Sequence, residues 1–194
     1  MKATAMKATD SRPRKRAPIE GDGMDAFLKL AHERYSCRKI RTDVPVEHEK
    51  IEAIVEAALA APTGVNYQAW RIWAIEDADA MARVVETSEF DYGGTAILVL
   101  GVREDEAWVR ADDGWNLADL DGGIVGAHML LAIQSLGLAT TWIGKFHPEA
   151  LVERFPQMAG CRLVGLFPLG YAADDAKPAP RHEQSRGSEI VEWI

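Results

Sequence analysis

The chain has 194 residues, of which 47% are hydrophobic and 27% are charged, and its formal net charge is −8. These values are ordinary for one globular domain with a closed core. The lack of an apolar run of about 18 residues argues against a membrane-spanning helix. An acidic balance also argues against nucleic acid as the main partner, because phosphate backbones are bound by basic faces.

The first 23 residues differ from the rest of the chain. They repeat the tetrapeptide MKAT and hold six Lys or Arg against three acidic residues, a local balance of +3 that leaves −11 for residues 24–194. With almost no large apolar side chain, this segment is expected to be a disordered basic arm, and a nucleic-acid-binding role is the alternative. It has no apolar stretch typical of a secretory signal. Cys37 and Cys161 lack zinc-site spacing, so we expect free thiols in the cytoplasm.

Hydrophobic periodicity predicts five helices and four strands after the arm. The helices are expected from Met24, at Glu47–Ala60, at 78–87, at Leu117–Leu138 and after His147. The strands are expected at Ala69–Glu76, Ala96–Val102, Thr140–Ile143 and Arg162–Gly170. Because these elements alternate without a regular βαβ repeat, the pattern favours an α+β fold.

Two features raise the possibility of a second subunit. The last 24 residues are polar and contain proline, yet they end in the large apolar side chains Ile190, Val191, Trp193 and Ile194. Such groups need a surface to pack on. Gly122 and Gly126 lie four residues apart on the longest predicted helix, a spacing that lets another helix approach closely, from the same chain or from another.

The familiar catalytic motifs are missing. The sequence contains no GxGxxG, GxxxxGK[ST], GxSxG or HExxH pattern. The five histidines show no paired ligand spacing, and His128, in an apolar helix, is expected to be a hydrogen-bonded core or interface residue. No metal site is therefore expected, and a cofactor would have to supply the difficult chemistry of an enzyme.

The first candidate cluster is the segment Arg34-Tyr35-Ser36-Cys37-Arg38, just past a predicted helix end. In an extended chain the alternate residues Arg34, Ser36 and Arg38 point the same way. Two guanidinium groups and a hydroxyl then converge, which suits a phosphate dianion. Taken alone, the same residues also fit an ordinary solvated basic strand.

Two further segments could face a planar ligand. In the turn Ala61-Pro62-Thr63-Gly64-Val65-Asn66-Tyr67-Gln68, the amides of Asn66 and Gln68 suit the polar edge of a heteroaromatic ring. In the segment from Gly137 to Phe146, Gly144 allows close approach of the backbone, and its N–H could donate to a ring nitrogen. Lys177 and Arg181, in the run Lys177-Pro178-Ala179-Pro180-Arg181, are late cations that could complete a phosphate site or belong to a solvated tail.

In order and spacing, these segments resemble the nitroreductase family of FMN-dependent oxidoreductases. The similarity covers about residues 24–194 and includes Arg-x-Ser-x-Arg, Ala-Pro-Thr-x-x-Asn-x-Gln-x-Trp and Gly-Leu-x-Thr-x-Trp-Ile-Gly. Each motif is weak alone, but the ordered set is fairly specific. The resemblance implies one FMN-binding domain at 24–194, including a C-terminal arm, and an α+β fold with a mixed sheet flanked by helices. It also implies an intertwined homodimer with FMN at the subunit interface.

The resemblance assigns roles to individual positions. Arg34, Ser36 and Arg181 would contact the FMN phosphate, with Lys177 and the neighbouring Tyr35 close by, and Arg38 would reach the ribityl chain or pyrimidine edge. The partner subunit would contribute the turn residues Pro62, Thr63, Gly64, Asn66 and Gln68. The isoalloxazine would be lined by Trp142, Ile143 and Gly144, with the Gly144 N–H near N5.

The implied activity is hydride transfer from NADH or NADPH, through flavin N5, to a nitroaromatic, a quinone or a similar small acceptor, with no side chain assigned as general acid. The alternatives are a specific reductive dehalogenation or dehydrogenation on the same cofactor, or a flavin-binding sensor or store without turnover. Two departures from larger relatives bear on the substrate. Only residues 103–117 follow the second strand, and Ser88–Gly93 offers no match for an Asn and a Lys near the ring.

Overall fold

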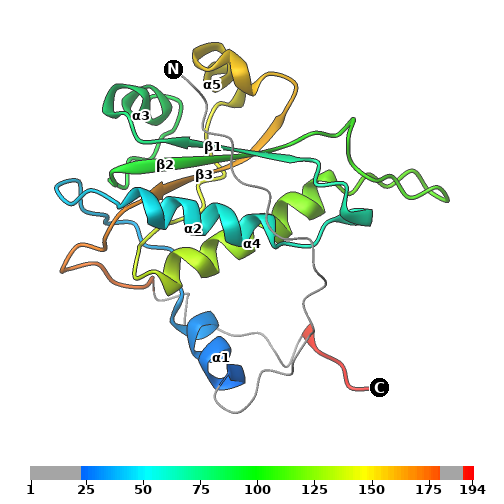
Figure 1. Cartoon of the computed structure of the whole chain (residues 1–194), viewed down its shortest axis with the longest axis horizontal. Helices are drawn as coiled ribbons and strands as arrows, with labels where there is room; N and C mark the ends of the chain where they lie inside the picture. Colours follow the sequence, from blue (N-terminus) through cyan, green and yellow to red (C-terminus); the bar gives the residue numbers. More distant parts are fainter. Residues whose placement is uncertain (1–22, 180–189) are drawn as a thin grey trace.

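A three-stranded sheet with two helices on each face forms the body of the protein (Figure 1). The structure is a computed structural model that describes residues 23–179 and 190–194. The strands β1 (Trp70–Ile75), β2 (Ala96–Val102) and β3 (Arg162–Leu169) lie in the order β1-β2-β3. Helices α2 (His48–Leu59) and α4 (Ala118–Ser135) cover one face, and α3 (Ala78–Val85) and α5 (Pro148–Arg154) cover the other.

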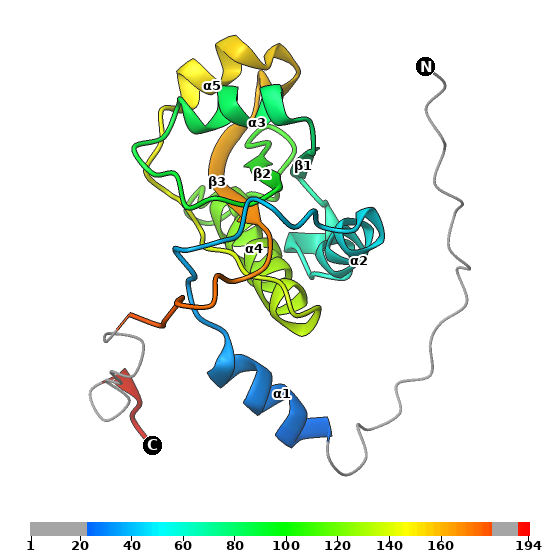
Figure 2. The same cartoon turned by 90° about the vertical axis from the view of Figure 1, so that its left-hand side faces the viewer.

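Three further elements lie outside these two layers. Helix α1 (Gly23–Glu33) precedes the body, and the short 3₁₀ helices η1 (Gly64–Asn66) and η2 (Pro156–Met158) lie in connections. Figure 2 shows α1 at the end of an extended link, away from the sheet. None of its residues is buried, and Phe27 keeps 50% of its surface exposed. The helix therefore presents an apolar face that the described residues of its own chain do not cover.

The central strand β2 fixes the layering. All seven of its residues are buried. Leu98, Leu100 and Val102 join the core beneath α2 and α4, whereas Ile97 and Val99 join the core beneath α3 and α5. Because successive side chains of a strand point to opposite faces, one continuous apolar sequence supplies both cores.

Most of the expected elements are confirmed within one or two residues. β2 coincides with the expected strand, and α2 begins after Glu47 and ends before Ala60 as its sequence indicates. The resemblance also predicted a mixed sheet, and this is corrected. Both strand pairings are antiparallel, and among the described residues the only parallel pairing is the isolated bridge between Ile40 and Gly93. Each strand lies beside its predecessor in the chain, so no parallel crossover is needed.

The expected strand Thr140–Ile143 is not a regular strand. The segment follows the free edge of β3 and is joined to it by two isolated antiparallel bridges, Ala139 with Gly170 and Ile143 with Leu166. The turn that leads into it has a clear local cause. Gly137 ends α4 with a left-handed φ of 71°, and the N–H groups of Leu138 and Gly137 donate to the carbonyls of Ile133 and Gln134. This Schellman motif directs the chain from α4 to the edge of β3.

The glycine pair on α4 packs inside its own chain. A Cβ on Gly122 would lie 2.8 Å from the Val102 side chain, and one on Gly126 would lie 2.3 Å from the Trp142 ring. The close approach that their spacing predicts is therefore made within the subunit. Gly123, in contrast, is exposed on the other side of the helix.

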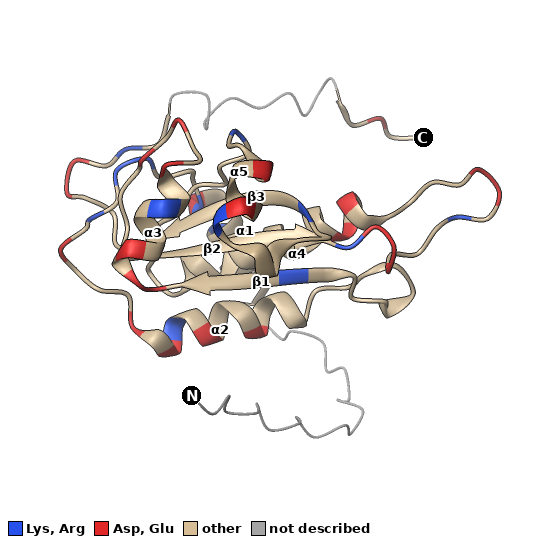
Figure 3. Cartoon of the chain, turned by 90° about the horizontal axis from the view of Figure 1, so that it is seen from above, with Lys and Arg blue, Asp and Glu red and all other residues tan. Residues whose placement is uncertain are grey.

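Residues 103–117 form a hairpin that projects from the body (Figure 3). Val109 and Asn116 form a bridge across it, and the Arg110 N–H donates to the Trp115 carbonyl at 2.9 Å. The Arg110 guanidinium pairs with Asp113 and lies 4.7 Å from the centre of the Trp115 ring. The tip of this hairpin is thus held together by its own side chains.

Candidate cofactor site

The first candidate segment is extended and runs beside two others. The Cys37 N–H donates to the Thr140 carbonyl at 2.9 Å, and the Arg41 N–H donates to the Tyr171 carbonyl at 2.8 Å. The Ala173 N–H donates back to Lys39 at 3.0 Å. The structure therefore brings the Arg34–Arg38 segment, the Gly137–Gly144 segment and the start of the C-terminal run together near the C-terminal end of α4.

Tyr35 and Cys37 face α4. Both line a small cavity of about 140 Å³ together with Gln134 and Gly137. Burial raises the pKa of the Tyr35 hydroxyl above its usual value, and a hydrogen bond with Cys37 raises it further. Because alternate side chains of an extended segment point to opposite sides, Arg34, Ser36 and Arg38 are expected to point away from α4.

The two arginines of this segment are available to a ligand. Neither Arg34 nor Arg38 forms an ion pair with a carboxylate of the described residues, and Arg38 donates only to the Ser36 carbonyl, at 3.1 Å. The adjacent cations behave differently, since Lys39 pairs with Asp175 and Arg41 pairs with Asp43. Two unpaired guanidinium groups on an acidic body form a locally positive surface suited to an anion.

Gly144 presents a free donor close to this surface. Ile143 exchanges two backbone hydrogen bonds with Leu166, at 2.9 and 3.0 Å. The following Gly144 is exposed, and its N–H has no acceptor among residues 23–179 and 190–194. No atom lies within 4 Å of the position that a Cβ would occupy. A planar ligand could therefore reach this N–H without a steric barrier.

The remaining residues expected near the C-terminal end of α4 are Trp142, Lys177 and Arg181. The Trp142 ring, expected to line the flavin, is packed between α4 and β3 in its own subunit. Lys177 is exposed and follows the residues that pair with the Lys39–Ile40 segment. Arg181 lies outside the described residues, as does the basic arm up to residue 22. The apolar tail is described from Ile190, and its Trp193 is 95% exposed.

The turn through Asn66 is strained. Three of its residues that are not glycine adopt left-handed φ values: 51° at Val65, 58° at Asn66 and 53° at Gln68. A β-branched residue such as Val65 rarely takes this conformation, and strain of this kind concentrates at functional sites. The side chains of Val65, Asn66, Tyr67 and Gln68 are all exposed. Residues 65–68 of the turn therefore offer a contiguous exposed surface.

Asp121 anchors this turn, and the sequence analysis did not single it out. The carboxylate is 1% exposed, its Oδ1 accepts the Gly64 N–H at 2.9 Å, and its Oδ2 has no partner among the described residues. Gly64 is further enclosed by Trp108 and Leu117, each with an atom 3.2 Å from the position of a Cβ. The signal in the sequence is that Asp121 occupies the same helical stripe as Val125 and Met129, which are core residues.

The two halves of the expected site lie at opposite ends of α4. The turn is attached near the N-terminal end through Asp121, whereas the arginine segment lies beside Leu138 and Thr140, just past the C-terminal end. α4 has 18 residues, and at 1.5 Å per residue it spans about 27 Å. Most of the length of this helix therefore separates the two halves within one chain.

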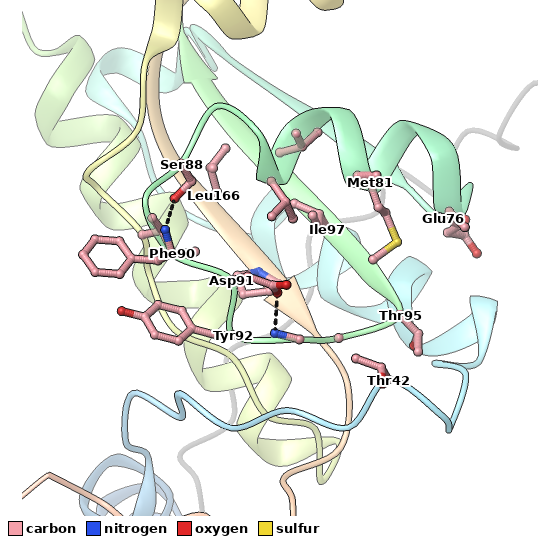
Figure 4. A pocket seen from close by; sticks show the side chains of 18 residues that line it. Thr42, Glu76, Met81, Ser88, Phe90, Asp91, Tyr92, Thr95, Ile97 and Leu166 are labelled. Atoms are coloured by element: carbon pink, nitrogen blue, oxygen red, sulfur yellow. Dashed lines mark hydrogen bonds between the residues drawn. The ribbon is translucent and has the colours of Figure 1, made fainter.

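A cavity of about 320 Å³ opens on the α3 side of the sheet (Figure 4). Its floor is apolar and includes Ile97, Leu166 and Ile143, the last of which also precedes Gly144. Its rim contains the Ser88–Gly93 stretch, where Asp91 accepts the Gly93 N–H at 2.9 Å. Among the described residues of the expected site, Ile143 alone lines this cavity. The acidic Asp91 stands in the stretch that lacks the expected Asn and Lys.

Two further features are absent from the described residues. They hold no group of three or more His, Cys, Asp or Glu side chains able to bind a metal ion. His128 instead hydrogen-bonds through Nδ1 with the Ile124 carbonyl at 2.9 Å, within α4. No helix among the same residues is both long and apolar enough to cross a membrane.

Similar sequences and solved structures identify the family of this chain. The sequence signature of the Nitroreductase family matches residues 31–88 and 85–171. The chain therefore belongs to the nitroreductase family. The crystal structure of a nitroreductase family protein from Clostridium difficile 630 shares 32% sequence identity, with a TM-score of 0.79 over 86% of this chain and 97% of that one.

Two other relatives carry more specific names. A protein of Thermus thermophilus called NADH dehydrogenase is 25% identical over 207 residues, covering 89% of this chain and 96% of its own. A nitroreductase with bound FMN from Desulfitobacterium hafniense DCB-2 shares the fold, with 23% identity and a TM-score of 0.66 over 86% of this chain and 97% of that one.

Asp121→Ala should loosen the strained turn. The change removes the acceptor of the Gly64 N–H, and the loss of a hydrogen bond to a charged group costs about 1.5–3 kcal/mol. Urea denaturation should show this loss in the free energy of unfolding, and amide hydrogen exchange at Gly64 should become faster. Asp119→Ala is the matched control, because Asp119 is exposed and pairs only with Arg162 at the surface. Equal effects of the two substitutions would contradict the anchoring role.

Proposed function

We propose that this protein is an FMN-dependent oxidoreductase that passes hydride from NADH or NADPH to a small electron acceptor such as a nitroaromatic or a quinone. One observation carries the proposal. Among the described residues Arg34 and Arg38 have no carboxylate partner and the Gly144 N–H has no acceptor, and they lie on segments that are hydrogen-bonded to each other at Cys37 and Thr140. Family membership supports the same conclusion, as do the FMN in the Desulfitobacterium protein and the name of the Thermus relative.

The residues present fit the two ends of FMN. Charged donors favour a phosphate dianion, and an unhindered backbone N–H suits a ring nitrogen that is approached edge-on. Gly144 meets the second condition because it lacks a Cβ and its N–H has no acceptor among the described residues. When bound, FMN supplies a ring that accepts hydride from the nicotinamide and donates it to the second substrate.

Each group of this site then has a binding or orienting role. Arg34 and Ser36 hold the phosphate, with Tyr35 beside them and with Lys177 and Arg181 as the late cations. Arg38 lies towards the ribityl chain or the pyrimidine edge, where its charge favours an anionic reduced ring. Ile143 and Gly144 orient the ring through the main chain. No side chain is assigned as general acid, because solvent can deliver the protons.

The site is completed by a second copy of the chain. The strained turn containing Pro62, Thr63, Gly64, Asn66 and Gln68 is attached near the N-terminal end of α4, whereas the arginines of its own chain lie past the C-terminal end. We infer that the turn serves the site of a partner subunit. The uncovered apolar face of α1 and the exposed Trp193 are available for the contact between subunits. We accordingly propose a homodimer with two FMN sites at its interface, in the cytoplasm.

An anaerobic titration tests the function. Purified protein reconstituted with FMN should lose its visible flavin absorbance when NADH or NADPH is added. It should recover the absorbance when a quinone or nitroaromatic follows. Protein that cannot be loaded with FMN would refute the proposal. Bound FMN that neither nucleotide reduces would indicate a flavin store, and turnover confined to one narrow substrate would indicate a specialised reductase or dehydrogenase.

Arg34→Ala should weaken FMN binding without unfolding the protein. A charged hydrogen bond contributes about 1.5–3 kcal/mol, so the Kd should rise by about 10- to 100-fold. Quenching of FMN fluorescence on titration of the apoprotein measures this change, and thermal unfolding of the apoprotein should be unaltered. Lys39→Ala is the control, because Lys39 is a neighbouring cation already paired with Asp175. Wild-type affinity in the Arg34 variant would show that the phosphate assignment is wrong.

A mixture of two variants tests the shared site. Arg34→Ala damages one half of the site, and Asn66→Gly damages the other while keeping the left-handed backbone that Asn66 requires. If each site takes its halves from two chains, refolding the variants together should restore about a quarter of the sites, because half of the dimers are mixed and each has one intact site. FMN content after gel filtration measures the recovery. No recovery would mean that each chain builds its own site.

A further inference from the structure

We propose that Trp142 is a positioning residue for the main chain at Ile143 and Gly144, and that its indole is locked behind the flavin site rather than lining it. This inference rests on the proposed function. It concerns a residue that the family resemblance would place against the ring. The structure instead shows its side chain fixed on three sides by α4 and β3.

The indole lies in a slot formed by two glycines. A Cβ on Gly126, in α4, would lie 2.3 Å from Cζ3 of the Trp142 ring. A Cβ on Gly165, in β3, would lie 2.3 Å from the Nε1 of the same ring. Real Cβ atoms do not approach other atoms so closely, so both positions must lack a side chain for the ring to enter. The six-membered part of the indole contacts α4, and the pyrrole part contacts β3.

Polar and aromatic contacts then fix the orientation of the ring. The Trp142 Nε1–H donates to the Val164 carbonyl at 2.9 Å. The Phe167 ring lies with its centre 4.9 Å from that of Trp142, at an interplanar angle of 53°. Because its N–H is satisfied in this way, the half-buried indole cannot swing out without losing its hydrogen bond. The side chain is consequently tied to β3 at a fixed point.

The main chain that follows is tied to the same strand. Ile143 exchanges hydrogen bonds with Leu166 in both directions, two residues beyond the carbonyl that accepts from Trp142. These contacts end at Gly144, whose N–H is left free among the described residues. The value of a donor to a bound ring depends on its being held in place before the ligand arrives. The contacts of the Trp142 indole with α4 and β3 hold the main chain at Ile143 and Gly144 in place.

Trp142→Phe tests the role, because phenylalanine keeps an aromatic ring but removes the Nε1–H and part of the packing. Gly165→Ala is a second test, because the added methyl group would occupy the space of the Trp142 indole and displace it without changing Trp142 itself. Both variants should raise the Kd of oxidised FMN about tenfold or more. A ring nitrogen accepts a hydrogen bond only while it is unprotonated, so oxidised FMN should be weakened more than reduced FMN. The midpoint potential should then become more positive by about 30 mV per tenfold difference.

Trp73→Phe is the matched control. Trp73 is a half-buried tryptophan of β1, which is separated from β3 by β2. It packs against the core beneath α3 and α5. It should lower thermal stability without changing FMN affinity or potential. If Trp142→Phe and Gly165→Ala also change only stability, Trp142 is a core residue and the inference is wrong. A wild-type protein that binds no FMN would instead refute the proposed function, so the two failures can be told apart.

Hydrogen exchange of the wild-type apoprotein provides a measurement that needs no variant to fold. The Trp142 indole N–H and the Ile143 amide should be protected before FMN is added, whereas the Gly144 amide should gain protection only on binding. An indole N–H that exchanges freely until FMN is present would overturn the inference, because the slot would then form with the ligand and not before it.

Discussion

The burial of β2 on both faces is the constraint on which the rest of the structure depends. Its seven residues supply side chains to two separate cores, so neither helical layer can shift without opening the other side of the strand. The same constraint holds β3 in register with β2. Ala139 and Ile143 are attached by isolated bridges along the free edge of β3. The donors of the candidate site are thus positioned by apolar packing that never touches a ligand.

The sequence predicts the elements well where burial follows a simple period. α2 shows a clean amphipathic stripe, and β2 is a short apolar run bounded by turn residues, so both are recognised with nearly their observed bounds. The segment Thr140–Ile143 has the composition of a strand, but its pairing depends on the exit angle of α4, which is set by the Schellman turn at Gly137. Local composition does not encode that angle. For the same reason the sequence leaves open whether Gly126 faces another chain or Trp142.

For the site, motif order predicts more than side-chain chemistry does. The arginine segment and the Gly144 segment are expected to meet, and backbone bonds join them at Cys37 and Thr140. The role of Asp121 is not predictable in this way, because a single acid in an apolar helix gives no sign of which distant N–H it accepts. The direction of the Trp142 ring is equally hidden. It depends on Gly126 and Gly165, which are 39 residues apart in the sequence.

The hairpin at 103–117 shows how such a protein can diversify. The ion pair and the ring contact at its tip are internal, and its base meets the body near Gly64 through Trp108. A surface loop that carries its own stabilising contacts tolerates changes in length at small entropic cost. Natural variation or laboratory recombination can therefore exchange the tip while the two cores stay intact. The fold separates the two packed cores from a peripheral hairpin that is stabilised by its own contacts.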